Sequence, residues 1–346
     1  MLKWLVTAIA VLLVVVIAFF AVATVTEYRP KAVEPLEISD LASQPGPIRP
    51  GDQVTAVTFN IGYAGLGQDQ DFFMDGGKMV RPSKQAIQTN LAGIYQDILA
   101  NPAQVYFVQE VDVDSRRSYG TDQKAKLETL DFANAAFATN FKSMFTPYPF
   151  PPIGKVDSGL MTLTNLEVTQ ADRYSLTVPF NWPVRLFNLK RCLLVERVPV
   201  QDGRELVLIN FHLEAYESGE GRGIQLGELI SVMGSEYAKG NYVIAGGDFN
   251  HTLPGVDFPE IDTTWQPGEI QAGDLPEGWT IANDPAVATS RLNNHPLTGD
   301  PATTQLFGID GFILSPNLTV EAVHTLDLGF TFADHNPVRL TATLDR

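Results

Sequence analysis

Residues 242–250 read Tyr-Val-Ile-Ala-Gly-Gly-Asp-Phe-Asn, an apolar run that passes through two glycines into Asp248 and Asn250. The apolar run predicts a buried strand. The two glycines let the backbone pack closely against its neighbours, so Asp248 and Asn250 can project from the turn that follows. We interpret this stretch as a strand of a central sheet that carries chemically active side chains at its end.

Other apolar runs along the chain also end in a polar side chain. The side chains in this position are Asn60, Glu110, His212, Asp310 and the pair Asp334-His335. A buried polar group without a partner costs roughly 2–7 kcal/mol, so these groups must pair, hold a metal ion or face a cleft. If the strand ends share one rim, the sequence predicts a cleft lined by carboxylates, imidazoles and amides. Taken singly, each has an ordinary interpretation, such as a turn residue or a core histidine.

The residue types in this set favour Mg²⁺, with Mn²⁺ as a substitute. Mg²⁺ prefers oxygen ligands and uses only one or two carboxylates. Glu110 is the best candidate ligand, followed by Asn60 and Asp310. Zinc fits less well, because the sequence has neither a His-x-x-x-His motif nor a pair of cysteines.

The remaining polar residues suit the attack of water on phosphorus. Asp248 could orient or deprotonate the water. His212, Asn250 and a protonated His335 could donate to the non-bridging oxygens of a phosphate. Asp334, directly before His335, could orient or charge that imidazole. The set therefore predicts metal-assisted hydrolysis of a phosphate ester.

The pattern along the chain predicts a layered α/β architecture with sheets inside and helices outside. Helices are expected between Ser83 and Asn101-Pro102, over residues 123–141 and over residues 222–239. Two long segments without core patterning, Gly62–Pro82 and 253–308, are typical of functional loops. Nine apolar runs predict strands, namely Val54–Ile61, Val105–Val111, Leu160–Thr164, Cys192–Val198, Leu206–Leu213, Tyr242–Gly246, Phe312–Leu314, Val320–Thr325 and Val338–Leu344.

The N-terminus carries an uncharged stretch from Trp4 to Val25. As a helix, residues 4–25 would span roughly 33 Å, about the thickness of the hydrocarbon core of a bilayer. Its length favours a single-pass anchor over a cleaved signal peptide, although Ala21-Val22-Ala23 fits a cleavage site. Lys3 favours a cytoplasmic start, which would place the rest of the chain outside the cell membrane. Residues 26–50 contain five prolines and predict a linker before a domain at 51–346.

The amino-acid composition argues against nucleic acid as a tightly bound partner. Of the 346 residues, 45% are hydrophobic and 18% are charged, which is typical of a globular protein. The formal net charge is −16, which works against tight, salt-driven binding of nucleic acid. The single cysteine, Cys192, lies in an apolar run and is expected to be a buried thiol. We expect a monomer.

The order of the motifs resembles the endonuclease/exonuclease/phosphatase superfamily, which includes pancreatic-type deoxyribonucleases and neutral sphingomyelinases. The resemblance runs from about Val54 to the C-terminus. Gly-Asp-Phe-Asn and the terminal Asp-His are its specific elements, and the others gain weight from their order. The matching elements are Thr58-Phe59-Asn60, Val108-Gln109-Glu110-Val111, Ser158-Gly159-Leu160, Asn210-Phe211-His212-Leu213, Gly247-Asp248-Phe249-Asn250, Ile309-Asp310-Gly311-Phe312 and Asp334-His335-Asn336-Pro337.

The resemblance implies a four-layer αββα sandwich of two mixed sheets, with the site at one end of the sheets. It implies that Glu110 binds Mg²⁺ with the help of Asn60 and Asp310. Asp248 would activate water, and Asn250 and His212 would contact the phosphate. His335, oriented by Asp334, would stabilise the developing charge. Gly311 departs from the pattern, because a Tyr or Arg is expected in its place.

Three functions are compatible with these residues. Acidic charge, the predicted anchor and the aromatic-proline loops 145–150 and 179–183 favour a membrane-anchored phosphoesterase acting on a lipid or small phosphate ester. Arg191 is expected to meet that phosphate, as one of four local cations with Lys155, Arg185 and Lys190. The alternatives are an extracellular Mg²⁺-dependent nuclease and a catalytically silent binding module. The costly set of polar strand ends argues against the silent module.

Overall fold

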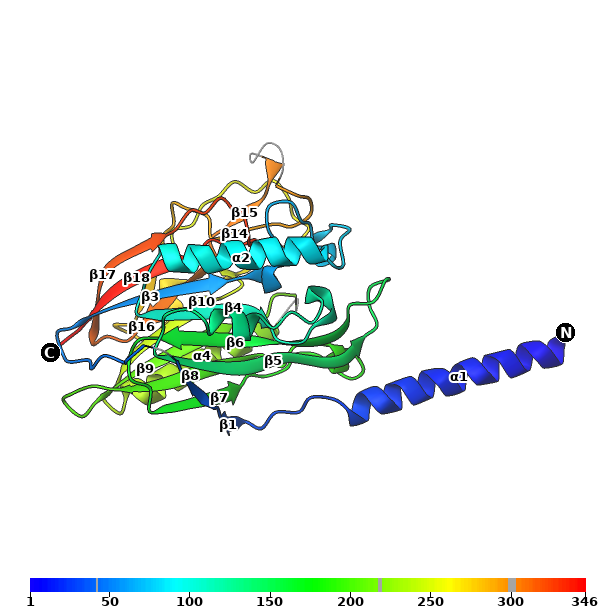
Figure 1. The fold of residues 1–346 in the computed structure, drawn as a ribbon, viewed down its shortest axis with the longest axis horizontal. Helices are drawn as coiled ribbons and strands as arrows, with labels where there is room; N and C mark the ends of the chain where they lie inside the picture. Colours follow the sequence, from blue (N-terminus) through cyan, green and yellow to red (C-terminus); the bar gives the residue numbers. More distant parts are fainter. Residues whose placement is uncertain (42, 217–219, 298–302) are drawn as a thin grey trace.

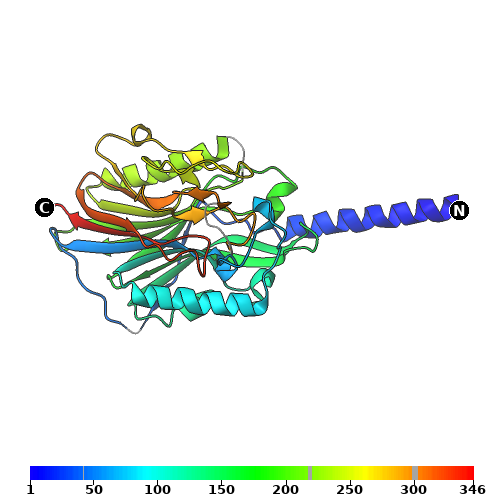
Figure 2. The same cartoon turned by 90° about the horizontal axis from the view of Figure 1, so that it is seen from above.

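The computed structural model describes residues 1–41, 43–216, 220–297 and 303–346. Two seven-stranded mixed sheets pack face to face, and one long helix covers the outer face of each (Figure 1, and Figure 2 from above). This arrangement confirms the predicted four-layer αββα sandwich. α1 projects away from one end of the sandwich.

The first sheet has the strand order β1-β7-β8-β9-β10-β16-β13. Its strands are β1 (Val33–Pro35), β7 (Gln170–Ser175), β8 (Cys192–Pro199), β9 (Glu205–His212), β10 (Tyr242–Asp248), β16 (Asp310–Leu314) and β13 (Thr280–Ala282). The second sheet has the order β17-β18-β3-β4-β6-β5-β2. Its strands are β17 (Leu318–Thr325), β18 (Val338–Leu344), β3 (Gln53–Asn60), β4 (Val105–Asp112), β6 (Gly154–Thr164), β5 (Asn134–Thr146) and β2 (Ile38–Asp40).

The remaining elements are helices and two small ribbons. The helices are α1 (Leu2–Val25), α2 (Lys84–Ala100), α3 (Gln123–Leu127) and α4 (Glu220–Tyr237). Short 3₁₀ turns are η1 (Gly62–Ala64), η2 (Phe73–Asp75), η3 (Arg116–Ser118), η4 (Val184–Phe187) and η5 (Ala272–Asp274). The two-stranded ribbons pair β11 (His251–Thr252) with β12 (Gly268–Glu269) and β14 (Ser290–Arg291) with β15 (Leu306–Phe307).

Alternation along the strands divides the apolar side chains among three layers of core. On β3, Ala56 faces the core between the sheets and Val57 faces α2, as expected from the period of two in a strand. α4 packs on the other sheet through Leu229 and Met233. Cys192 is fully buried, as predicted. All nine predicted strands are present, with boundaries shifted by a few residues.

The helix predicted between Ser83 and Asn101-Pro102 is α2, and it begins where expected. The hydroxyl of Ser83 accepts a hydrogen bond from the backbone N–H of Ala86 at 3.1 Å, which caps α2. The helix ends at Ala100, before Asn101-Pro102. The third predicted helix, over 222–239, is α4.

The prediction of a helix over 123–141 is wrong beyond Leu127. α3 ends there, and Asn134–Thr146 forms β5, which pairs with β6 on one side and β2 on the other. The alanines of this segment face alternate sides, with Ala135 in the α2 layer and Ala136 between the sheets. The two rows of strand hydrogen bonds therefore outweigh a helical spacing of apolar residues.

Residues 26–50 are not only a linker. Within this segment β1 pairs with β7 and β2 pairs with β5, so each seven-stranded sheet gains an edge strand. Ile48 is buried between the sheets. Because proline lacks a backbone donor but is tolerated at sheet edges, a proline-containing segment can still form such strands.

α1 carries no buried residue. Among the described residues, it is a helix long and apolar enough to cross a membrane, with a mean hydropathy of 3.2. The assignment rests on the length and composition of the helix, and a signal sequence meets the same two criteria. The helix is therefore a candidate transmembrane span.

Glu196 is an unusual residue of the core. It lies on β8 between Leu194 and Val198, which face the space between the sheets. Its side chain is fully buried, and neither carboxyl oxygen has a hydrogen-bond partner among the described residues. Burial raises the pKa of Glu196 to about 8.

We predict that Glu196→Gln raises the free energy of unfolding at pH 8 but not at pH 4. The buried carboxyl favours its protonated form, so stability falls as pH rises from the unfolded pKa near 4.5 to the folded value near 8. At about 1.4 kcal/mol per pKa unit, the gain at pH 8 is on the order of a few kcal/mol. Denaturant unfolding across this pH range measures it. The exposed Glu167→Gln variant is the control, and an equal gain at both pH values would contradict the prediction.

Candidate active site

The register of three strands brings three predicted site residues into one row. In the first sheet, Asp248 at the end of β10 lies opposite His212 of β9 on one side and Asp310 of β16 on the other. Residues in register on adjacent strands point to the same face of a sheet. The Nε2 atom of His212 lies 3.3 Å from Oδ2 of Asp248. Strand pairing alone therefore assembles the centre of the site.

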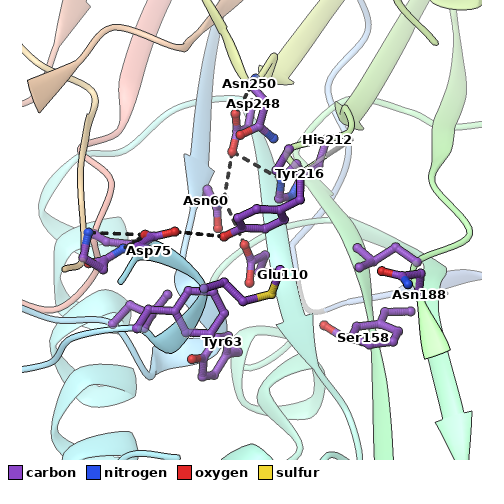
Figure 3. Close-up of a pocket in the computed structure, with 18 of the residues that line it drawn as sticks. Asn60, Tyr63, Asp75, Glu110, Ser158, Asn188, His212, Tyr216, Asp248 and Asn250 are labelled. Atoms are coloured by element: carbon purple, nitrogen blue, oxygen red, sulfur yellow. Dashed lines mark hydrogen bonds and ion pairs between the residues drawn. The ribbon is translucent and has the colours of Figure 1, made fainter. Parts of the chain in front are cut away.

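Asn60 brings the second sheet into contact with this row. Its side-chain N–H₂ donates to Oδ2 of Asp248 at 3.1 Å and to Oε1 of Glu110 at 3.3 Å. Figure 3 shows Asn60 between these two carboxylates. The Oδ1 atom of Asn60 accepts from the backbone N–H of Gly62 at 3.0 Å, which fixes the orientation of the amide.

His335 is oriented by Asp310, so the prediction that Asp334 orients it is wrong. Nδ1 of His335 lies 2.8 Å from Oδ2 of Asp310. Nε2 of the same ring lies 3.8 Å from Oδ2 of Asp248 and 3.3 Å from the hydroxyl of Ser290. His335 also forms an isolated antiparallel β-bridge with Ser290. Asp334 acts on His335 only through its charge, because the hydrogen bond to the imidazole comes from Asp310.

Asp334 instead belongs to a second cluster beside the first. It accepts a hydrogen bond from the amide of Asn293 at 2.7 Å. Asn293 also contacts Asp75, which accepts from the hydroxyl of Tyr216 at 3.1 Å. Burial and the neighbouring Asp334 raise the pKa of Asp75 to about 6. In Figure 3 the hydroxyl of Tyr216 points toward Asp75, and a dashed line marks their hydrogen bond.

The sequence did not single out Asp75, Tyr216 or Asn293. Each lies outside the strand-end motifs. The lack of core patterning in Gly62–Pro82 and 253–308 was the only signal for Asp75 and Asn293, and Tyr216, which lies in neither segment, had none. Both segments contribute to the wall of the cavity.

The charges of the central row divide it into an acid and a base. Burial alone would lower the pKa of His335, but Asp310 and Asp248 outweigh it and raise that pKa to about 10. Burial, followed by the charge of Asp310, raises the pKa of Asp248 above its usual range. Burial and the charge of Arg191 lower the pKa of His212. At neutral pH, His335 is therefore cationic and His212 is neutral.

Two groups of side chains could hold a metal ion. Asp248, Asp310 and His335 place one ligand atom each within 4.8 Å of one another. Asp310 was predicted as a ligand beside Glu110, but its close contact is His335. The second group is Glu110 with Asn60. Burial raises the pKa of Glu110, the charge of Arg117 lowers it and the charge of Asp334 raises it. Asp334 therefore lies near this group.

The donor set of the second group fits Mg²⁺. Oδ1 of Asp334 is buried and lacks a hydrogen-bond partner within the part of the chain that the structure describes. A buried carboxyl oxygen without a partner is costly, and a bound cation would satisfy it. Glu110 and Asp334 offer oxygen ligands, whereas Asn60, also predicted as a ligand, presents its N–H₂ to Glu110 and its Oδ1 to the backbone of Gly62.

Two arginines of the cavity wall offer positive charge. Arg191, predicted to contact substrate, is buried, lines the cavity and donates to the backbone carbonyl of His212 at 3.3 Å. Arg117 was not predicted. It donates through two nitrogens to Asp112 at 3.0 and 3.2 Å, and its guanidinium stacks 3.8 Å from the ring centre of Tyr63.

The other predicted cations pair elsewhere. Lys155 pairs with Asp114, and Arg185 and Lys190 both pair with Glu27. None of these three lines the cavity. Arg191 is therefore the one member of the predicted four that the described structure places at the site.

Asn250 is held in the turn after Asp248. Its backbone N–H donates to Oδ1 of Asp248 at 2.9 Å, and its amide donates to the backbone carbonyl of Leu213 at 2.8 Å. The positive φ of 49° is a conformation that asparagine tolerates better than most residues. Asn250 therefore holds Asp248 and still lines the cavity.

The cavity above these residues has a volume of about 440 Å³. His212, Asp248, Glu110 and Arg191 form its polar end. Its remaining wall is largely apolar and includes Phe72, Phe73, Ile153, Val184 and Phe187. The arrangement offers a base, a cationic acid and oxygen ligands at the closed end of an apolar chamber.

We predict that Asp310→Asn lowers the pKa of His335 by more than Asp334→Asn does. Asp310 bonds the imidazole directly, whereas Asp334 acts only through its charge. NMR titration of labelled histidine in metal-free protein measures the shift from about 10 toward the ordinary value near 6.5. Equal shifts in the two variants would contradict the assignment of Asp310 as the partner.

No family model matches the sequence, and no curated protein matches it. Several solved structures share the fold. A protein from Beutenbergia cavernae described as endonuclease/exonuclease/phosphatase superposes with a TM-score of 0.60 at 19% identity, over 85% of this chain and 72% of that one. ANGEL2, described as a 2′,3′-cyclic phosphatase, gives 0.55 at 14% identity, over 90% and 99%. TDP2 from Caenorhabditis elegans gives 0.50 at 14% identity, over 84% and 74%. The chain therefore has the fold of the endonuclease/exonuclease/phosphatase superfamily, which its sequence motifs resemble.

Proposed function

We propose that the chain is a metal-dependent phosphoesterase that uses Mg²⁺ and is anchored in a membrane by α1. The observation that carries this proposal is the row around Asp248, which joins a buried carboxylate, a neutral His212 and the Asp310–His335 pair at the closed end of the cavity. The fold adds support, because one protein that shares it is described as endonuclease/exonuclease/phosphatase and another as a 2′,3′-cyclic phosphatase.

Glu110 and Asp334 would hold the metal ion, and Asn60 would position Glu110 beside it through its N–H₂. When bound, Mg²⁺ supplies positive charge that neutralises the phosphate and polarises its oxygens. We favour this group over Asp248, Asp310 and His335, because the ring of His335 is already held between the other two carboxylates.

The side chains of the row divide the work of hydrolysis. Asp248 takes a proton from the attacking water, and the amide of Asn60 keeps that carboxylate in place. The water oxygen bonds to phosphorus, the ester P–O bond on the opposite side breaks, and the leaving oxygen takes a proton from the solvent. His335 is cationic and held by Asp310, so it stabilises the negative charge that develops on the phosphate. His212 and Asn250 donate to the phosphate oxygens.

The cavity wall favours a small or lipid phosphate ester over a nucleic acid. Proteins that bind nucleic acid line a groove with lysines and arginines that track the backbone. Here the arginines of the cavity wall are Arg117, Arg191 and Arg291, and each is buried or largely buried. The net charge of −16 points the same way. We propose a single-pass protein with its catalytic domain outside the cytoplasm, acting as a monomer.

We predict that Asp248→Asn reduces Mg²⁺-dependent turnover by about 10²–10⁴-fold, the range for loss of a general base. Hydrolysis of bis(p-nitrophenyl) phosphate and p-nitrophenyl phosphate measures it, and the pair also separates diester from monoester activity. EDTA should abolish turnover and added Mg²⁺ should restore it. Asp114→Asn, at an exposed ion pair, is the matched control. Unchanged turnover in Asp248→Asn, or full activity in EDTA, would refute the proposal.

A further inference from the structure

Large apolar side chains stand exposed beside the mouth of the catalytic cavity. They come from the end of β5, from the turn that joins β5 to β6 and from the segment around η4. We call this set the apolar rim and define it as Met144, Tyr148, Phe150, Trp182 and Val184, whose exposed fractions are 66%, 69%, 95%, 53% and 53%. Tyr148 and Val184 also line the cavity. Exposed apolar side chains grouped in this way mark an interaction surface.

The apolar rim is continuous with the end of α1. The ring of Phe19 in α1 stacks on Phe187 with 5.8 Å between ring centres and contacts Phe145 at 6.3 Å. The indole N–H of Trp182 donates to the hydroxyl of Thr24 at 3.1 Å. Because Phe187 lines the catalytic cavity, the candidate membrane helix touches the cavity wall itself.

The position of these contacts along α1 determines how deep they would lie in a bilayer that α1 spans. Phe19 lies six residues before the end of the helix at Val25, which is roughly 9 Å along the axis. Any span formed by α1 therefore places Phe145 and Phe187 at the boundary of the hydrocarbon, not in bulk water. Trp182 meets the last turn of the helix, and tryptophan is enriched at this interface of a bilayer.

Charged residues begin directly beyond this level. Glu27 follows α1 and pairs with Arg185 at 3.3 Å and with Lys190 at 3.2 Å. An apolar band that gives way to paired charges matches the change from hydrocarbon to headgroups in a bilayer. In Figure 1, the β5–β6 hairpin extends toward the side of the sandwich on which α1 projects.

We propose that the apolar rim rests in the bilayer and that the site takes its phosphate ester from phospholipids of the membrane that holds α1. This inference rests on the proposed phosphoesterase activity and names its substrate class. The apolar wall near Phe73 and Phe187 receives the hydrophobic part of the lipid. Arg191 and the row around Asp248 receive the phosphate at the closed end. The cavity volume of about 440 Å³ holds a headgroup and part of the glycerol, while the acyl chains stay in the bilayer.

The test uses the full chain reconstituted in vesicles that contain phosphatidylcholine, phosphatidylethanolamine, phosphatidylglycerol and phosphatidic acid. Mass spectrometry follows the lipids and their products with Mg²⁺, and bis(p-nitrophenyl) phosphate reports turnover of a soluble substrate. The double variant Met144→Glu/Phe150→Glu places charge on the apolar rim at two residues that do not line the cavity. Leu99→Glu alters an equally apolar exposed residue on α2 and is the matched control.

We expect the unmodified chain and Leu99→Glu to cleave at least one of these lipids. The rim variant should lose about tenfold or more of that activity, because each 1.4 kcal/mol of lost membrane contact is a factor of ten. Its turnover of the soluble substrate should be unchanged. Cleavage of the soluble substrate without any lipid would overturn the inference and leave the phosphoesterase proposal intact. Equal lipid cleavage by the rim variant would overturn it too, and no turnover of either substrate would overturn the phosphoesterase proposal itself.

Discussion

The register of β10 between β9 and β16 is the constraint on which the site depends. Asp248 faces the centre only because both neighbouring strands pair with it in that register. The two glycines before it make the fit possible. A Cβ atom on Gly247 would lie 2.0 Å from the carbonyl oxygen of Phe211, and one on Gly246 would lie 2.6 Å from the ring of Phe312. Only glycine leaves room for such close packing. Gly246 and Gly247 are therefore required by the packing of the strands, whatever the chemistry of Asp248.

A second constraint holds the two sheets at a fixed offset. Gln109 of β4 donates to the side-chain oxygen of Asn210 on β9 at 2.9 Å, and Asn210 donates to the backbone carbonyl of Met161 on β6 at 2.9 Å. These buried polar groups are satisfied only when the sheets meet in this alignment. The same alignment brings Asn60 to Asp248, so hydrogen bonds deep in the core set the distance between the proposed metal ligands and the proposed base.

The sequence predicted the strands and the strand-end residues because both depend on local patterns. It could not predict which side chains pair, since that depends on direction as well as proximity. Asp334 is adjacent to His335 in the chain, yet Asp310 holds the imidazole because of the way β16 lies beside β10. Asp75 and Tyr216 come from loops without periodicity, so only the folded chain brings them together. Local sequence patterns therefore identify the candidate site residues, whereas long-range strand pairing determines which of them contact one another.

The strand that replaces the predicted helix over 128–141 continues past the sandwich on the side of α1. β5 has 13 residues and β6 has 11, whereas β3 and β4 have eight each. The extra length carries the hairpin beyond the sandwich, where Met144 and Phe145 no longer have a sheet to pack against. Apolar residues in that position are unfavourable in water but suit a bilayer interface. The helical spacing of apolar residues within 123–141 obscured this strand, and its continuation past the core brings Phe145 into contact with Phe19 of α1.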